Sequence, residues 1–187
     1  GVGLLEIRDA KRGSLVRAFD APPPEVRALA FSPDGAKLAC QTAEGVAVLA
    51  VSSGEIERSI ELDEEGRGPH QIAYAPDGAW LAVAAHPGQV HLFDAKTGAP
   101  RAVLEPAKPG VSRRRPTFAI QPGGGQLATA GQGVTLRLWD TKSGAEIGAL
   151  TGHRDRVDQV AFAPGAAVVA TGGGDGTVRL WSPGGEE

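Results

Sequence analysis

The phrase FAPGAAVVA, residues 162–170, is the last of four copies of one pattern, and this pattern decides the fold. The earlier copies are FSPDGAKLA from Phe31, YAPDGAWLA from Tyr74 and IQPGGGQLA from Ile120. In every copy, proline stands two residues and alanine eight residues after the leading apolar residue. An apolar run ends nineteen residues after each leading residue, at Ala50, Phe93, Trp139 and Trp181. This constant spacing predicts a rigid repeated unit whose length varies only in the connections.

Turn signals divide each unit into short segments. Asp34-Gly35, Asp77-Gly78 and Gly123-Gly124 lie between β-prone runs, and such pairs supply the positive φ of a tight hairpin. Further glycine-containing pairs follow about every ten residues, and no segment shows the apolar period of about 3.6 residues that marks a helix. Each unit is therefore predicted to be four short antiparallel strands.

The stretch GHRDRVDQVAFAPGAAVVATGGGDGTVRLW, residues 152–181, closely resembles a WD repeat, and LWD at 138–140 supplies the Trp-Asp pair of that family. The resemblance implies an all-β fold, a β-propeller with four-stranded blades around a central channel. We expect residues 1–187 to form a single, partial WD-repeat propeller. The expected repeats span approximately 10–52, 53–95, 96–141 and 142–183, and residues 3–9 form a leftover strand of a preceding blade. Because WD-repeat rings usually have about seven blades, we expect four repeats to make an incomplete propeller.

The resemblance also implies a structural hydrogen-bonded network inside a blade. The fourth repeat holds every member of this network: His153, Thr171, Asp175 and Trp181. The third repeat keeps only Thr129 and Trp139. In the first repeat the corresponding residues are Cys40, Glu44 and Ala50. We therefore expect one blade to hold the full network and the others to rely on packing and backbone ladders.

The sequence offers little that is typical of catalysis. A hydroxyl, an imidazole and a carboxylate at Thr171, His153 and Asp175 could resemble a catalytic triad, but the repeat motif already accounts for all three as structure. The four histidines have no neighbouring carboxylate or cysteine at metal-ligand spacing, and no glycine cluster is followed by Lys-Ser or Lys-Thr. The prediction is a protein without enzymatic activity, cofactor or metal.

Protein binding is the favoured function. In WD-repeat propellers, partners usually dock on the face formed by the connections from one blade's outer strand to the next blade's inner strand. In this sequence the connections carry the candidate partner-binding residues: His70, Arg113, Arg114, Arg115, Arg154, Asp155 and Arg156. The arginine run predicts a site for an acidic peptide or a phosphate group. An open alternative is a propeller enzyme or small-ligand binder, although the predicted inner strands offer only Arg27 and Asp158 as charges for the channel.

Composition excludes some partners and compartments. The net charge of −3 gives no overall basic field for nucleic acid or an anionic membrane, and no window holds the roughly 18 apolar residues of a membrane span. Cys40 is the single cysteine, so an internal disulfide is excluded. The chain contains no methionine and begins with Gly1, so we expect a fragment that lacks the true N-terminus. We expect a bacterial, cytoplasmic scaffold, part of a larger multi-domain protein, whose partners are other proteins or peptides and further blades or domains of the parent chain.

Overall fold

Every regular element of the described chain is a β-strand. The computed structural model describes residues 4–20, 26, 28–62, 70–85, 88–105, 116–130, 133–165 and 167–182. Within these ranges, no helix is long and apolar enough to span a membrane. The expected all-β architecture of four-stranded blades is therefore present.

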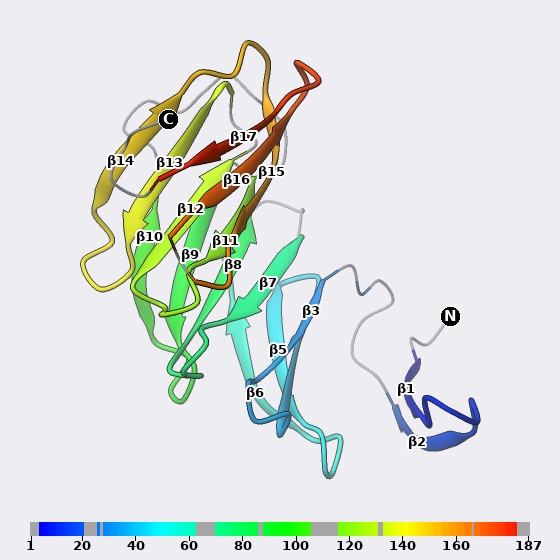
Figure 1. The fold of residues 1–187 in the computed structure, drawn as a ribbon. Coiled ribbons are helices and arrows are strands. Elements are labelled where there is room, and N and C mark those ends of the chain that lie inside the picture. The colour runs from blue at the N-terminus through cyan, green and yellow to red at the C-terminus, as the bar shows by residue number, and fades with distance from the viewer. Residues whose placement is uncertain are drawn as a thin grey trace.

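Five antiparallel sheets follow one another along the chain (Figure 1). The first has two strands, β1 (Leu4–Arg8) and β2 (Leu15–Asp20). The next sheet contains β3 (Leu29–Phe31), β4 (Lys37–Gln41), β5 (Gly45–Ala50) and β6 (Ile56–Glu61). It is followed by the sheet of β7 (Gln71–Tyr74), β8 (Trp80–Ala85), β9 (Gln89–Asp94) and β10 (Pro100–Leu104). The fourth sheet contains β11 (Thr117–Ile120), β12 (Gln126–Ala130), β13 (Thr135–Asp140) and β14 (Glu146–Thr151). The last has three strands, β15 (Val157–Phe162), β16 (Val169–Gly173) and β17 (Val178–Trp181).

The sheets are offset by one strand from the repeats predicted from the sequence. Each predicted repeat contributes its first strand as the outer strand of one sheet and its next three strands to the following sheet. The predicted leftover strand, residues 3–9, overlaps β1, which pairs only with β2. Consecutive sheets are thus tied together by shared repeats as well as by packing.

Glycine makes the turn between the first two strands of three sheets. Gly35, Gly78 and Gly124 have φ of 69°, 71° and 72°, a left-handed conformation that costs glycine little. In the first of these turns the Gly35 N–H donates to the carbonyl of Ser32 at 2.8 Å. The Asp-Gly and Gly-Gly pairs of the repeated phrase therefore act as the predicted hairpin turns.

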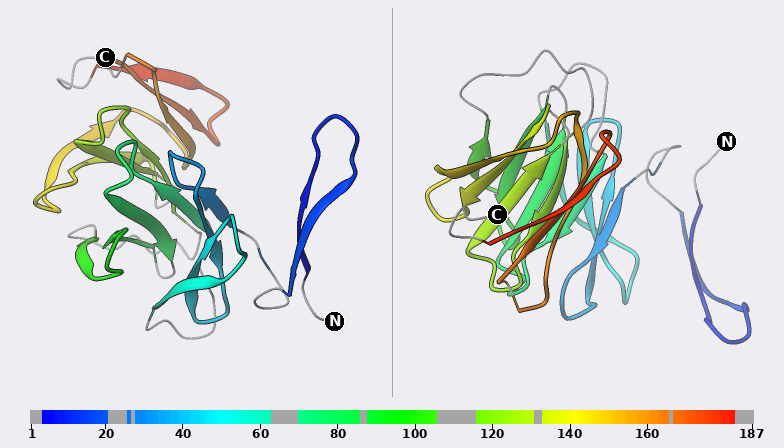
Figure 2. Two further views of the ribbon diagram at one scale, coloured as in Figure 1. Left: turned by 90° about the horizontal axis from the view of Figure 1, so that it is seen from below. Right: turned by 45° about the horizontal axis from the view of Figure 1, so that its top comes forward.

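Most of the core lies between neighbouring sheets, and one small cluster, Cys40, Ala47 and Leu49, lies on the β3–β6 sheet alone. Three clusters of buried apolar side chains join the β3–β6 sheet to β7–β10, β7–β10 to β11–β14, and β11–β14 to β15–β17. Figure 2 shows these sheets arranged side by side as a fan, with the β1–β2 hairpin beside the β3–β6 sheet. The fold is an arc of blades, each stabilised by its neighbours.

One spacing predicted from the sequence is wrong. In β4 and β5, Leu38 pairs with Leu49, whereas the equivalent residue Leu81 pairs with Phe93 and Val169 pairs with Trp181. Leu49, not Ala50, therefore holds the aromatic place of the first repeat. The cause is a hairpin that is one residue shorter.

The two hairpins differ in the hydrogen bond that closes them. In the first repeat the Thr42 N–H donates to the Gly45 carbonyl at 2.8 Å, which leaves two residues in the loop. In the fourth repeat the Gly173 N–H donates to the Thr177 carbonyl at 3.1 Å, which leaves three. Side-chain direction alternates along a strand, so the shorter loop changes which residue faces each neighbouring sheet.

Two leucines at equivalent places in their sheets allow a test of this packing. Leu92 of β9 is 1% exposed, whereas Leu180 of β17 is 63% exposed. Leu92→Ala should lower the free energy of unfolding by about 2–5 kcal/mol because it leaves a cavity between two sheets. Leu180→Ala should change it by less than about 0.5 kcal/mol. Urea unfolding of dilute protein measures both, and equal losses would contradict the packing described here.

Candidate functional site

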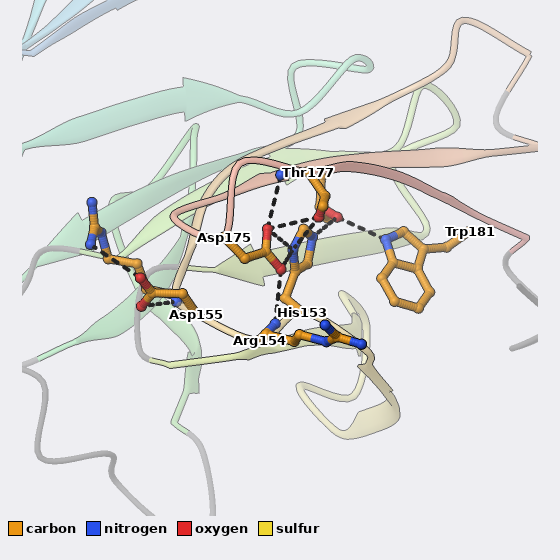
Figure 3. A network of polar contacts seen from close by, with 8 residues as sticks. His153, Arg154, Asp155, Asp175, Thr177 and Trp181 are labelled. Carbon is orange, nitrogen blue, oxygen red and sulfur yellow. Dashed lines mark hydrogen bonds and ion pairs between the residues drawn. The ribbon is translucent and has the colours of Figure 1, made fainter.

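The last sheet carries a chain of four polar side chains (Figure 3). The Trp181 Nε1–H donates to Thr171 Oγ1 at 2.8 Å, and Thr171 Oγ1 lies 2.8 Å from His153 Nε2. His153 Nδ1 lies 3.0 Å from the carboxylate of Asp175. Because an ionised carboxylate can only accept, Nδ1 carries a proton, and in the neutral imidazole Nε2 then accepts from the Thr171 hydroxyl. Every donor in the chain thus has an acceptor.

Strand order explains why these residues meet. In a four-stranded meander, the connection into the inner strand and the hairpin between the second and third strands lie at the same edge of the sheet. His153 belongs to the connection before β15, and Asp175 belongs to the hairpin between β16 and β17. Thr171 and Trp181 stand on β16 and β17. We use "connection edge" for this edge, which includes residues 152–156 and 174–177 in the last sheet.

Hydrogen bonds hold Asp175 in its ionised form. The main-chain N–H of Arg154 donates to Oδ2 at 2.8 Å, and the Thr177 hydroxyl donates to Oδ1 at 2.7 Å. These bonds, with those from the Thr177 N–H and His153, hold the pKa of Asp175 well below its usual range. The carboxylate therefore fixes the connection before β15 against the β16–β17 hairpin.

These distances are also those of a catalytic triad of hydroxyl, imidazole and carboxylate. The Thr171 hydroxyl, however, is too deeply buried for a substrate to reach it. Thr171 is 2% exposed and His153 is 5% exposed. The Thr171 oxygen already accepts from the Trp181 indole. A nucleophile must be reached by its substrate, and this hydroxyl is enclosed by the sheet. The arrangement joins strands and leaves no open reaction site at Thr171.

Among the described residues, the other sheets hold at most part of this polar series. In the fourth sheet the Trp139 Nε1–H donates to Thr129 Oγ1 at 2.9 Å. In the sheet of β3–β6, Cys40 occupies the equivalent place, since it pairs with Leu29 as Thr129 pairs with Phe118. Burial raises the pKa of the Cys40 thiol to about 11, so it is protonated at neutral pH. Cys40 is thus a packing residue.

Some of the candidate partner-binding residues lie together on the connection edge. Arg154 and Asp155 are exposed, and Arg156 is half-buried. The Arg156 Nε–H donates to Asp158 at 2.7 Å, which leaves Arg154 as the more exposed arginine of this connection. Arg27, Arg113, Arg114 and Arg115 lie outside the described residues.

His70 has a bridging contact that the sequence did not reveal. Its Nε2 lies 2.5 Å from the carbonyl of Pro116, which precedes β11 of the next sheet. The next residue continues this bridge: the Gln71 amide donates to the Phe118 carbonyl at 2.8 Å, and its oxygen accepts from the Phe118 N–H at 3.0 Å. Gln71 thus pairs with the main chain of a neighbouring inner strand as another strand would. A glutamine at a strand start carries no sequence signal for this role.

Metal-ligand groups are not assembled in the described part of the chain. No three His, Cys, Asp or Glu side chains there are placed to hold a metal ion. On the described inner strands, the charged side chain is Asp158, which is already paired with Arg156. The expected absence of a cofactor and of a metal stays a prediction.

Replacing Thr171 tests the network. Thr171→Val keeps the shape but leaves the Trp181 N–H without its acceptor and His153 Nε2 without its donor, both in a buried setting. We expect a loss of about 1–3 kcal/mol in the free energy of unfolding. The matched control, Thr129→Val, removes the acceptor of one indole only and should cost about 1 kcal/mol. A cost for Thr171→Val no greater than for Thr129→Val, by urea unfolding, would contradict a cooperative network.

The lowered pKa of Asp175 predicts a pH dependence. The group binds a proton more readily in the unfolded chain, so its stabilising contribution is complete above the ordinary aspartate pKa of about 4 and is lost as the pH falls toward the folded value. Asp175→Asn should therefore reduce stability at neutral pH and flatten its fall in acid. Asp158→Asn, a more exposed aspartate of the same sheet, is the control. Parallel curves of stability against pH for wild type and Asp175→Asn would refute this role.

One family model and two known proteins match parts of this chain. Residues 144–182 match the family "WD domain, G-beta repeat". WD repeat-containing protein SL1-17 of Schistosoma mansoni is 31% identical over 137 residues, which is 73% of this chain and 43% of that protein. Meiotic recombination protein rec14 of Schizosaccharomyces pombe is 28% identical over 125 residues, which is 67% of this chain and 40% of that protein.

The chain spans less than half the length of each of these two relatives. Both organisms are eukaryotes, and these matches therefore give no support to the expected bacterial origin. That origin stays a prediction. The matched residues 144–182 include the complete polar chain of the last sheet. Residues 144–182 thus match a WD repeat, and the all-β chain is similar to a WD-repeat protein along 73% of its length.

Proposed function

We propose that this chain is an interaction scaffold without catalytic activity, which binds another protein at its connection edge. The observation that carries the proposal is the way Asp175 fixes that edge. It binds the Arg154 N–H and His153 on one connection and Thr177 on the adjacent hairpin. An edge whose main chain is fixed in this way loses little backbone conformational entropy when a partner docks.

The charge of this edge indicates the kind of partner. Arg154 presents an exposed guanidinium, and Arg156 lies two residues further along the same connection. Guanidinium groups bind carboxylates with paired hydrogen bonds, so an acidic peptide segment suits this edge. Asp155 lies between the two arginines and limits the positive charge, which favours a peptide over a long polyanion such as nucleic acid.

The alternative of a propeller enzyme has less support. Its reactive groups would have to come from several inner strands, and two of the triad-like residues of the last sheet, Thr171 and His153, are enclosed. A fluorophosphonate probe, which labels activated hydroxyl nucleophiles, distinguishes the two functions. The scaffold proposal expects no labelling of Thr171, and labelling would replace it.

We further propose that this chain works within a larger, multi-domain protein. The two relatives described above are each more than twice as long as the segment that matches. A scaffold of this kind brings a partner close to other domains, whose effective local concentration it raises.

Charge reversal on the connection edge tests the proposed binding. Arg154→Glu should weaken binding of a labelled poly-glutamate peptide several-fold and reduce its dependence on salt, because it removes an exposed cation from the contact. Lys142→Glu is the matched control, since this exposed lysine lies in the turn between β13 and β14, at the opposite edge of the blades. Fluorescence anisotropy at two salt concentrations measures both variants. An equal effect of both substitutions would show a general charge effect and overturn the proposed site.

A further inference from the structure

A polar pocket lies between the β3–β6 sheet and the β7–β10 sheet, at the edge opposite the connection edge. Its volume is about 250 Å³. The turn between β3 and β4 forms one wall, and the turns β7–β8 and β9–β10 form the other. Sites for cofactors usually measure about 300–1,000 Å³, so this pocket suits a single long side chain. The polar residues that line it are Ser32, Asp34, Lys37, Tyr74, Asp77 and Lys96.

The stacking of the sheets does not by itself leave this space open. Lys37 and Trp80 are both the seventh residue of the repeated phrase, and Tyr74 and Ile120 are both its first. Between the next two sheets, Trp80 is 4% exposed, and Ile120 packs against its cluster. Lys37 instead places its Nζ 2.8 Å from the carboxylate of Glu57. The pocket is therefore the place that an indole fills between the next two sheets.

The pocket contains a hydroxyl that lacks a partner. Tyr74 Oη is buried and has no hydrogen-bond partner in the described part of the chain. Burial, followed by the nearby carboxylates of Asp34 and Glu57, raises the pKa of Tyr74 to about 12, and Arg58 acts in the opposite direction. The hydroxyl is thus protonated at neutral pH, in surroundings that two carboxylates make negative. A ligand that bonds this hydroxyl relieves the cost of leaving it buried and unbonded, and the negative surroundings favour a cation.

Two carboxylates at the pocket have capacity that the fold does not use. Asp34 Oδ1 accepts from the Ser32 hydroxyl at 2.5 Å, and Asp77 Oδ1 accepts from a main-chain N–H at 2.9 Å. Within the described ranges, Oδ2 of each aspartate makes no hydrogen bond. The equivalent turn of the β11–β14 sheet has Gly123 in the aspartate position, and Gly124 still has φ of 72°. Since the turn forms without a carboxylate, both Oδ2 atoms are left for a ligand.

The lysines do not cancel this negative charge. Lys37 is already neutralised by its ion pair with Glu57. Lys96 is exposed, and its long stem lets the ammonium group turn into water. The two aspartates therefore outweigh the one remaining cation at the pocket.

We propose that this pocket binds one arginine side chain of a protein partner. The guanidinium lies between the carboxylates of Asp34 and Asp77 and donates to the Tyr74 hydroxyl, while its aliphatic stem lies along Pro33. A guanidinium suits three acceptors better than an ammonium group because its N–H donors form a rigid planar fork and are weakly hydrated. The pocket lies away from the connection edge and does not rest on the function proposed there, so failure of either proposal leaves the other intact.

The single tyrosine of the chain allows a direct measurement. In NMR spectra of tyrosine-labelled protein, acetyl-arginine amide should shift the Tyr74 ring signals until the site is saturated. Acetyl-citrulline amide has nearly the same shape without the charge and should bind several-fold more weakly. Asp77→Asn keeps the acceptor of the turn but removes the charge, so it should weaken binding of acetyl-arginine amide several-fold. Lys96→Gln removes a repelling cation and should strengthen this binding several-fold.

Two further variants complete the experiment. Lys142→Gln changes the equivalent lysine of the β13–β14 turn and should leave binding unchanged. Lys37→Trp should fill the pocket as Trp80 fills the equivalent place, and so abolish binding. Circular dichroism and urea unfolding check that every variant is folded.

Four results would overturn the proposal. The first is the absence of any shift with acetyl-arginine amide, and the second is equal binding of acetyl-citrulline amide. The third is weaker binding by Lys96→Gln, because it would indicate a site for an anion. The fourth is binding of agmatine, a free guanidinium compound, without binding of acetyl-arginine amide, because it would assign the pocket to a small cation rather than to a protein partner.

Discussion

The structure depends on one constraint: each four-stranded sheet is apolar on both faces, so each needs a neighbour on either side. Strand β8 is buried along its whole length, and β5 is buried at five of its six positions. A single sheet of this kind would expose most of its apolar surface to water. Each sheet that stacks on its neighbour buries the apolar surface of one further face. The buried apolar clusters of the arc therefore lie between successive sheets.

Hydrogen bonds between polar groups then hold the sheets at their edges. In the last sheet, the chain from Trp181 to Asp175 runs from the body of the sheet to its connection edge. Between the second and third full blades, Gln71 performs a comparable task by another route, since it joins two inner strands directly. The first network stiffens one blade, whereas the second fixes one blade against the next. The two sets of hydrogen bonds thus act at different places, one within a blade and one between two blades.

Much of the fold could be predicted from the sequence because its signals are local and repeated. The Asp-Gly turns and the apolar strand segments recur at nearly constant spacing, and the structure has strands at each of these places. The exception is the first repeat, where a shorter hairpin moves Leu49 into the place predicted for Ala50. Loop length is not visible in the spacing of apolar residues, because Val46 to Ala50 is apolar at every position. The contact of Gln71 was missed for a different reason: its partner is main chain, which leaves no mark on the sequence.

The last sheet shows why side-chain geometry alone does not establish chemistry. Thr171, His153 and Asp175 have the distances of a catalytic triad, yet the hydroxyl is enclosed and already bonded to Trp181. In an enzyme, the same three groups stand at an opening, and part of their bonding capacity is left for the substrate. Here all of that capacity is used between strands. A polar chain that is fully satisfied and buried stabilises a fold, and the exposed side chains at its end, such as Arg154, are the ones left to meet a partner.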